Sequence, residues 1–117
     1  MKIKRGGIII ADLGQHETSI QPGIRPCVVM SNDMANRHSP VITVVPLTSK
    51  IHKKEYLPTH VFLNGYKSTG LERRSLALCE QITSVAFPDI LEVADSVSER
   101  KLAETGYAVK IQCRLAA

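Results

Sequence analysis

Two segments of the sequence bring side chains that can bind phosphate to the ends of predicted strands. Arg25 precedes Pro26, and a residue before proline is restricted to extended backbone, which fixes the arginine at the start of a strand. Its planar, permanently charged guanidinium suits phosphate oxygens and the charge that develops on phosphorus during transfer. Thr48 and Ser49 follow a β-branched strand, where hydroxyls and turn N–H groups could hold a phosphate. Strand-end arginines and turn-capping hydroxyls are also ordinary structural features.

Other polar side chains near these segments have two interpretations each. Ser19 and Gln21 precede Arg25 in a polar loop and could hydrogen-bond bases or sugar hydroxyls, although loops are polar for solubility alone. His60 opens a predicted strand and could carry a proton near neutral pH, but a histidine at a strand edge is more often structural. These residues alone leave the choice open.

The sequence lacks the motifs of several large enzyme classes. It has no phosphate-binding G-x-x-x-x-G-K-[ST], no dinucleotide-binding G-x-G-x-x-G and no hydrolase G-x-S-x-G,. Its three cysteines, Cys27, Cys79 and Cys113, lie far apart among apolar neighbours, which predicts buried thiols and neither a disulfide framework nor a zinc site. With no metal-ligand spacing such as H-x-x-x-H, we expect chemistry without a metal or cofactor.

Length and composition predict one globular domain over residues 1–117. The chain has 117 residues, of which 44% are hydrophobic and 22% charged, and its apolar runs are too short to cross a membrane. The amino end does not fit a secretion signal, so we expect a cytoplasmic protein. A net charge of +4 favours a polyanionic partner,. Because only 4% of residues are aromatic, nucleic acid would be bound mainly by charge and hydrogen bonds.

Short β-branched or alternating segments predict a mainly β fold. We expect strands over 8–13, 27–30, 41–46, 60–63 and 75–82, a possible hairpin at Asn64-Gly65, and one helical turn within 31–40,. Ser96-x-x-Glu99 fits a capping box that begins a final helix with a packing stripe of Leu102, Gly106, Val109 and Cys113,. These elements predict a small, strongly bent antiparallel barrel with a C-terminal helix.

Two features of these strands require partners. Segments 27–30 and 41–45 are apolar on both faces, so we expect a second copy of the chain to cover part of them. Glu80 falls on the apolar face of the segment 75–82. An unpaired buried carboxylate is costly, so Glu80 must lie at a strand end, at a bulge or beside a partner.

Taken together, these motifs resemble the MazF/PemK toxins of bacterial toxin–antitoxin pairs. The resemblance covers about residues 4–82 and depends on the order and spacing of Lys4-Arg5-Gly6, Ala11-Asp12-Leu13, Ser19-Ile20-Gln21-Pro22-Gly23-Ile24-Arg25-Pro26, Ser31-Asn32-Asp33, Asn36-Arg37-x-Ser39-Pro40, Pro46-Leu47-Thr48-Ser49, Leu57-Pro58-Thr59-His60-Val61, Gly70-Leu71 and Glu80-Gln81-Ile82.

The resemblance implies an SH3-like barrel of the CcdB/MazF/PemK type that acts as a homodimer. It implies a metal-independent endoribonuclease that cuts single-stranded RNA within a short sequence, leaving 2′,3′-cyclic phosphate and 5′-hydroxyl ends. It also implies a small acidic antitoxin that blocks the site, with operator DNA bound only by the toxin–antitoxin complex. The family's catalytic pair falls on Arg25 and Thr48, and we expect RNA contacts from Ser19, Gln21, Ser49, His60 and Gln81.

The chain departs from the family pattern at several accessory positions. Gly7 stands where relatives carry an acidic residue, Ile20 where many carry glutamate, and Leu78 where some carry arginine. The segment 83–86 replaces the usual R-T-[IV]-D. The general base is therefore unassigned. Two alternatives stay open: a barrel like the gyrase poison CcdB, which cuts nothing, or a barrel that only binds protein or DNA.

Overall fold

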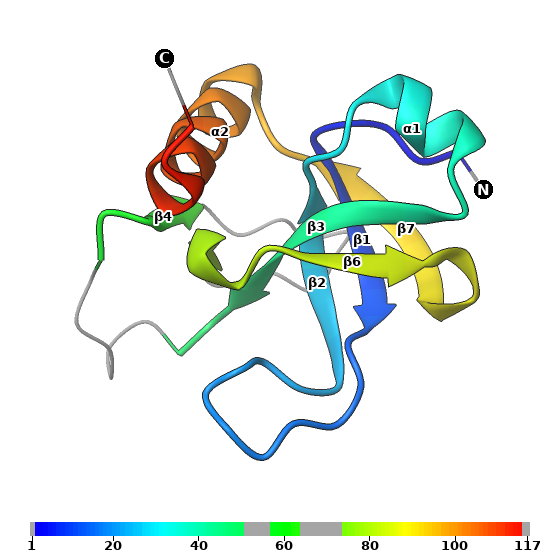
Figure 1. Ribbon diagram of the computed structural model, residues 1–117, viewed down its shortest axis with the longest axis horizontal. Helices are drawn as coiled ribbons and strands as arrows, with labels where there is room; N and C mark the ends of the chain where they lie inside the picture. The colour runs from blue at the N-terminus through cyan, green and yellow to red at the C-terminus, as the bar shows by residue number, and fades with distance from the viewer. Residues whose placement is uncertain (1, 51–56, 64–73, 116–117) are drawn as a thin grey trace.

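The computed structural model describes residues 2–50, 57–63 and 74–115 of the chain. These residues form a seven-stranded antiparallel sheet with two α-helices and two short 3-10 helices (Figure 1). In chain order the elements are β1 (Gly7–Asp12), β2 (Ile24–Val29), α1 (Asp33–His38), β3 (Val41–Thr48), β4 (His60–Leu63), β5 (Ser75–Leu78), η3 (Cys79–Gln81), β6 (Thr83–Ala86), η4 (Phe87–Asp89), β7 (Ile90–Ser96) and α2 (Glu99–Cys113).

The long strand β3 organises the sheet. The strand order is β4-β5-β3-β2-β1-β7, and β6 also pairs with β3. The first half of β3 pairs with β6 and its last two residues, Leu47 and Thr48, pair with β5. The three residues of η3 therefore interrupt what would otherwise be one strand alongside β3. This bent antiparallel sheet with a C-terminal helix confirms the predicted fold class, although no pairing within the described residues closes β4 onto β7.

The core consists of two hydrophobic clusters on opposite faces of the central strands. Ile8 and Val28 belong to one cluster, which also includes Ala108 of α2, whereas Ile9 and Val29 belong to the other. Because neighbouring side chains of a strand point to opposite faces, a strand buried on both sides needs apolar residues at every position. These central strands are therefore buried within the chain itself, and the covering of part of their surface by a second copy stays a prediction.

The C-terminal helix begins two residues later than the sequence suggested. Ser98 is the N-cap, with a side chain that accepts a hydrogen bond from the Lys101 N–H, whereas Ser96 ends β7 and pairs with Gly7. The strands β6 and β7 were not predicted, because Pro88 suggested that the strands had ended. None of the helices in the described part of the chain is long and apolar enough to span a membrane.

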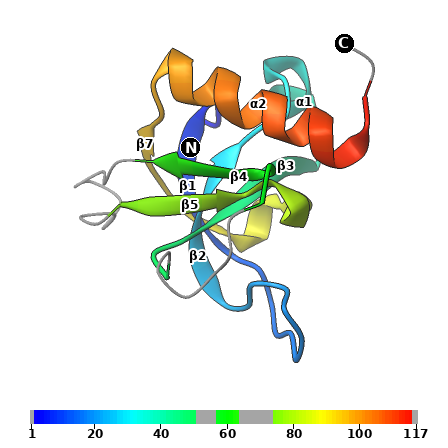
Figure 2. The same cartoon turned by 90° about the vertical axis from the view of Figure 1, so that its left-hand side faces the viewer.

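The packing of α2 differs in part from the predicted stripe. Leu102 and Val109 pack against the first cluster as expected, and Figure 2 shows α2 lying across β4. Cys113, however, is exposed, while Cys27 and Cys79 are buried, so the prediction of three buried thiols is wrong for Cys113. The possible hairpin at Asn64-Gly65 lies outside the described residues.

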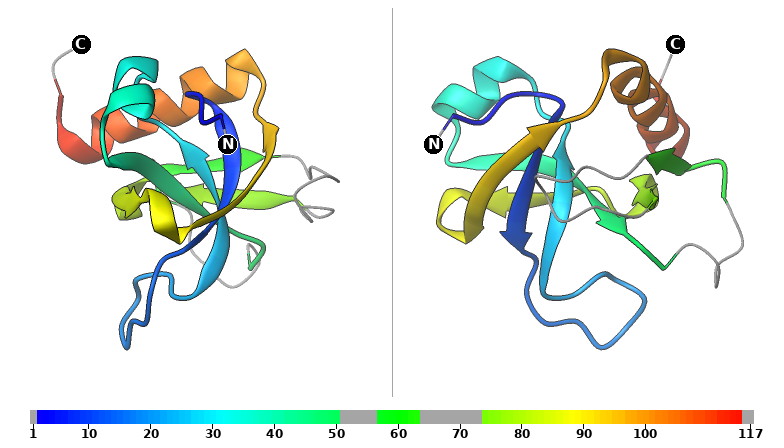
Figure 3. Two further views of the ribbon diagram at one scale, coloured as in Figure 1. Left: turned by 90° about the vertical axis from the view of Figure 1, so that its right-hand side faces the viewer. Right: turned by 180° about the vertical axis from the view of Figure 1, so that it is seen from behind.

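The strands β1 and β2 place two regions at opposite ends of the sheet. The loop 13–23 connects them at one end, and the N-terminal segment and α1 lie side by side at the other (Figure 3). The predicted helical turn within 31–40 is the helix α1, capped by the Asn32 side chain, which accepts from the Ala35 N–H. The candidate catalytic residues lie at the loop end.

Candidate functional site

Arg25 is the second residue of β2 and is held by its own chain. Its backbone pairs with Ala11 of β1, and its side-chain Nε donates a 2.8 Å hydrogen bond to the Pro22 carbonyl. Among the described residues, neither Nη atom donates a hydrogen bond. One edge of the guanidinium is therefore fixed, while its terminal nitrogens are available to a ligand. Bidentate phosphate binding requires this arrangement.

Thr48 ends β3 and is only 3% exposed. Its hydroxyl accepts a 3.2 Å hydrogen bond from the Lys50 N–H, so the hydroxyl proton remains able to donate to a ligand. Ser49, the next residue, is exposed. The predicted hydroxyl pair is thus divided between a nearly buried threonine and an exposed serine.

The register of β2 and β3 relates Arg25 to Thr48. Cys27 pairs with Pro46 and Val28 with Val45, and the same register continued toward the site brings Arg25 level with Thr48. At that point β3 turns to pair with β5 through Leu76. The two candidate catalytic residues therefore occupy corresponding positions at the ends of neighbouring strands, where the sheet bends.

The loop that precedes Arg25 is closed at its base by backbone hydrogen bonds. Gly23 N–H donates to the Gly14 carbonyl at 2.7 Å, and Leu13 N–H donates to the Gly23 carbonyl at 2.9 Å. Gly14 and Gly23 both have positive φ, at 83° and 76°, a conformation that favours glycine. The glycines allow the chain to reverse so that it enters β2 at Ile24, one residue before Arg25.

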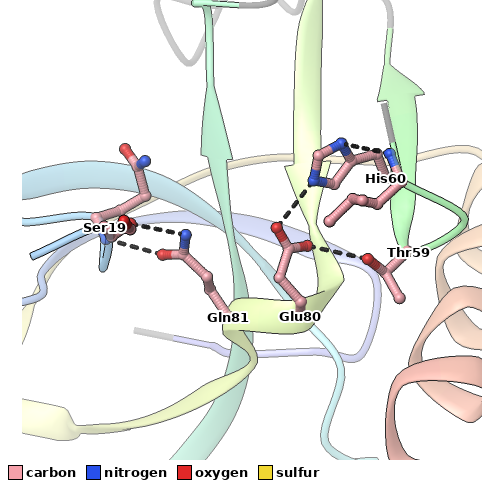
Figure 4. Close-up of polar contacts among 7 residues, drawn as sticks. Ser19, Thr59, His60, Glu80 and Gln81 are labelled. Atoms are coloured by element: carbon pink, nitrogen blue, oxygen red, sulfur yellow. Dashed lines mark hydrogen bonds and ion pairs between the residues drawn. The ribbon is translucent and has the colours of Figure 1, made fainter. Parts of the chain in front are cut away.

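Gln81 holds the middle of this loop. Its Oε1 accepts a 2.8 Å hydrogen bond from the Gln21 N–H, and its Nε2 donates a 3.0 Å hydrogen bond to the Ser19 carbonyl (Figure 4). Both ends of the Gln81 carboxamide bind the loop backbone, and we call this pair of hydrogen bonds the Gln81 clamp. The clamp does not involve the side chains of Ser19 and Gln21. The structure thus brings together three predicted RNA contacts, Ser19, Gln21 and Gln81.

The neighbouring side chain, Glu80, points away from Gln81 toward β4 (Figure 4). Its Oε2 lies 2.8 Å from His60 Nε2, and its Oε1 accepts a 3.2 Å hydrogen bond from the Thr59 hydroxyl. His60 Nδ1 accepts from the Leu57 N–H at 3.2 Å, so Nε2 carries the proton that is donated to Glu80. Of the three expected arrangements for Glu80, a strand end, a bulge or a partner, the structure shows the first and the third, because β5 ends at Leu78 and Glu80 binds His60 and Thr59.

His60 has the environment of a structural histidine. Its side chain is 3% exposed and both ring nitrogens are engaged by protein groups. A direct contact with RNA would require one of these bonds to break. The geometry therefore favours a role in fixing β4 to η3, and separates His60 from the cluster formed by Ser19, Gln21 and Gln81.

A groove of about 360 Å³ opens beside the loop, next to the Gln81 clamp. It lies between the loop and β6, and its lining includes Ile20, Gln21, Gln81, Thr83 and Ser84. In the sequence, residues 83–86 stand out only as a departure from the family pattern. No local signal identifies Thr83 and Ser84 as lining a groove, because only the pairing of β6 with β3 brings them beside the loop.

The position of Gly7 shows why one departure from the family pattern suits this chain. Gly7 is buried, and its N–H donates to the Lys4 carbonyl at 2.9 Å. A Cβ added there would lie 3.0 Å from the Lys4 carbonyl oxygen, closer than side chains normally approach a backbone oxygen. An acidic side chain at this position would require the backbone to shift.

Comparison with known proteins agrees with this architecture. The family model described as PemK-like, MazF-like toxin of type II toxin–antitoxin system matches residues 4–113. A protein of Staphylococcus saprophyticus named Endoribonuclease MazF is 34% identical over 113 residues, which cover 97% of this chain and 92% of that protein.

Solved structures show the same fold. MazF from Deinococcus radiodurans superimposes with a TM-score of 0.81 at 18% identity and covers 98% of this chain and 99% of its own. A mycobacterial endoribonuclease solved in complex with its cognate antitoxin has a TM-score of 0.77 at 19% identity, with 98% of both chains covered. On the extent of the family match and the identity to the staphylococcal relative, this chain belongs to the PemK-like, MazF-like toxin family of type II toxin–antitoxin systems.

Proposed function

We propose that this chain is an endoribonuclease toxin that cleaves single-stranded messenger RNA within a short sequence. The family membership supports this function, as does the staphylococcal relative, which is named as an endoribonuclease. The observation that carries the proposal is the Arg25 guanidinium, which is tethered through Nε to Pro22 and lies on the strand next to Thr48. The same matches favour cleavage over the gyrase-binding alternative.

In the proposed reaction the nucleophile is the ribose 2′-hydroxyl of the substrate. It attacks the adjacent phosphorus, the bond from phosphorus to the 5′-oxygen breaks, and the products carry a 2′,3′-cyclic phosphate and a 5′-hydroxyl. The protein must orient these atoms and stabilise the charge that develops on phosphorus. No metal or cofactor takes part in this scheme.

Arg25 and Thr48 have separate tasks in this scheme. The Nη atoms of Arg25 would donate to the non-bridging oxygens as their negative charge grows. The Thr48 hydroxyl, which accepts from Lys50 N–H, would donate to a non-bridging oxygen or pass a proton to the departing 5′-oxygen. Among the described residues Glu80 is already bound to His60 and Thr59, which argues against its serving as the base.

We propose that some residues contact the RNA directly and that others hold the contacting residues in position. The side chains of Ser19, Gln21 and Ser49 would contact bases or sugar hydroxyls. Gln81 would act mainly as a positioning residue, because its carboxamide already binds the loop backbone. His60 would act indirectly, by holding the Glu80 side chain beside it.

The proposed partners follow from the family. The chain would act in the cytoplasm as a homodimer and would be blocked by a small acidic antitoxin. Its own charge of +4 suits an acidic inhibitor and an RNA substrate,. Operator DNA would be bound only by the toxin–antitoxin complex, and no membrane is involved.

The proposal is tested by incubating the purified protein with a long single-stranded RNA in the presence of EDTA and mapping the ends. We expect discrete cuts with 5′-hydroxyl ends. In Arg25→Ala, cleavage should fall by a factor of about 100 or more with the circular dichroism spectrum unchanged. Arg100→Ala, which removes an exposed guanidinium from α2, is the matched control and should cut normally. A folded Arg25→Ala protein that cuts at the full rate would overturn the assignment, and intact RNA together with gyrase binding would support the CcdB-like alternative.

A further inference from the structure

A second hollow, whose lining does not include Arg25, lies between the N-terminal segment and α1. Its volume is about 860 Å³, and its lining includes Lys2, Lys4, Asp33, Arg37, His38 and Phe87. None of the proposed catalytic or RNA-contact residues belongs to it. We refer to it as the basic hollow.

The cations of the basic hollow come from two separate segments of the chain. Lys2 and Lys4 flank Ile3, which is buried, so in an extended segment both lysine side chains point outward on the same side. Arg37 lies in the last turn of α1. All three cationic side chains are exposed. Two elements far apart in the sequence therefore present their charge toward one space.

One carboxylate, Asp33, lies among these cations, but protein groups already bind it. Its Oδ1 accepts a 2.8 Å hydrogen bond from the Arg5 N–H and a 3.2 Å hydrogen bond from Asn36 Nδ2. These two hydrogen bonds, followed by the charges of Arg37 and Lys4, lower its pKa below the usual value for an aspartate. Lys4, Arg37 and Asp33 all line the hollow. With one carboxylate against three permanent cations, the hollow keeps an excess of positive charge.

The aromatic ring in the lining indicates the kind of polyanion. Phe87 is half-buried, packs on the second hydrophobic cluster and is also among the residues that line the hollow. An aromatic side chain beside cations suits a single-stranded nucleic acid, whose unpaired bases can stack while its phosphates bind the cations. A duplex keeps its bases paired and would present only phosphates to this surface.

We propose that the basic hollow binds single-stranded RNA several nucleotides away from the bond that is cut. This inference rests on the proposed ribonuclease function and extends its substrate site. The hollow is lined by the N-terminal segment, α1 and Phe87, and neither Arg25 nor Thr48 belongs to its lining. An RNA that only fills the cleavage site would not reach the hollow, but a longer RNA would.

The test compares RNA length in a variant that lacks the three cations, Lys2→Ser/Lys4→Ser/Arg37→Ser. The substrates are the mapped cleavage sequence alone and the same sequence with about ten extra nucleotides on its 5′ or its 3′ side. We expect kcat/KM for the short RNA to stay within about twofold of wild type. For one of the extended RNAs, KM should rise at least fivefold at low salt. The slope of log KM against log salt should fall in magnitude by about 2, as expected for the loss of three phosphate contacts to a single strand.

The matched control is Arg100→Ser/Lys110→Ser/Arg114→Ser, which removes the same charge from exposed positions of α2 and its C-cap. It should leave the preference for longer RNA unchanged. An equal effect of the two triple variants would mean that only net charge matters, and would overturn the proposal. Unchanged behaviour of the first variant, or a loss of duplex DNA binding without any loss of RNA binding, would overturn it as well.

Failure of the proposed function can be separated from failure of this inference. If the wild-type protein cuts no RNA, the function fails. The hollow is then tested by fluorescence anisotropy with a labelled single-stranded RNA of about twenty nucleotides. Equal affinity of the wild type and the first triple variant for that RNA would reject the hollow independently.

Discussion

The carboxamide oxygen of Gln81 accepts a 2.8 Å hydrogen bond from the backbone N–H of Gln21, a residue 60 positions earlier in the chain. The same carboxamide donates to the Ser19 carbonyl. One side chain on η3 thus fixes the loop that leads into Arg25, whose Nε binds the carbonyl of Pro22, the residue after Gln21. The position of the guanidinium therefore depends on a residue from another part of the sheet.

Replacing Gln81 by alanine should loosen the loop without unfolding the protein. The change removes two hydrogen bonds, each contributing about 1 kcal/mol, and both are made to a loop at the edge of the fold. We expect cleavage to fall by about tenfold, mainly through kcat, with faster hydrogen exchange at residues 19–21. Gln112→Ala, the same change at an exposed position of α2, should alter neither quantity. Normal exchange at 19–21 in Gln81→Ala would contradict the positioning role.

The hydroxyl of Thr48 can be separated from its packing by two substitutions. Thr48→Val keeps the shape of a residue that is 3% exposed but removes the proposed donor, so cleavage should fall by a factor of about 100. Thr48→Ser keeps the hydroxyl and should retain most of the activity at a small cost in stability. Cleavage rates and urea unfolding midpoints of both variants check this. Equal activity of the valine and serine variants would remove Thr48 from the reaction.

The pair formed by His60 and Glu80 should contribute stability more than chemistry. His60→Ala removes the donor to Glu80 and the acceptor for the Leu57 N–H, which should lower the free energy of unfolding by about 2–3 kcal/mol. Glu80→Gln can keep an oxygen toward His60 and place its amide toward Thr59, so it should cost about 1 kcal/mol or less. Urea unfolding measures both effects. A stable Glu80→Gln protein that has lost cleavage more than 100-fold would instead make this carboxylate catalytic.

Thiol labelling should distinguish Cys113 from the two buried cysteines. Burial raises the pKa of Cys27 to about 12, partly opposed by the nearby Arg25 charge, and burial followed by the Glu80 charge raises the pKa of Cys79 to about 12. Because the reactive form is the thiolate, a pKa raised this far leaves about one thiolate in ten thousand at pH 8. A maleimide should therefore modify only Cys113, which is exposed, in the folded protein at that pH. After denaturation all three should react, as mass spectrometry would show.

The sequence alone was sufficient for features that depend on neighbouring residues. The β-branched run in β3 and the extended backbone at Arg25 follow from residue type and from Pro26, and the motif order was enough to recognise the family. The helix start was ambiguous because Ser96 and Ser98 both resemble caps. In the structure Ser96 belongs to β7 and pairs with Gly7 of β1, which leaves Ser98 as the N-cap. That pairing joins parts of the chain that are distant in the sequence.

Only the tertiary structure decided how the site residues act. In the sequence, Glu80 and Gln81 continue a predicted strand, and Glu80 falls on its apolar face. In the structure β5 ends at Leu78, and the 3-10 turn that follows sends Glu80 to His60 and Gln81 to the loop at 19–21. Local alternation could not show this break, because Ser75–Leu78 is buried on both faces and its pattern is the same whether the strand continues or stops. The break depends on hydrogen bonds between segments that meet only when the sheet has formed.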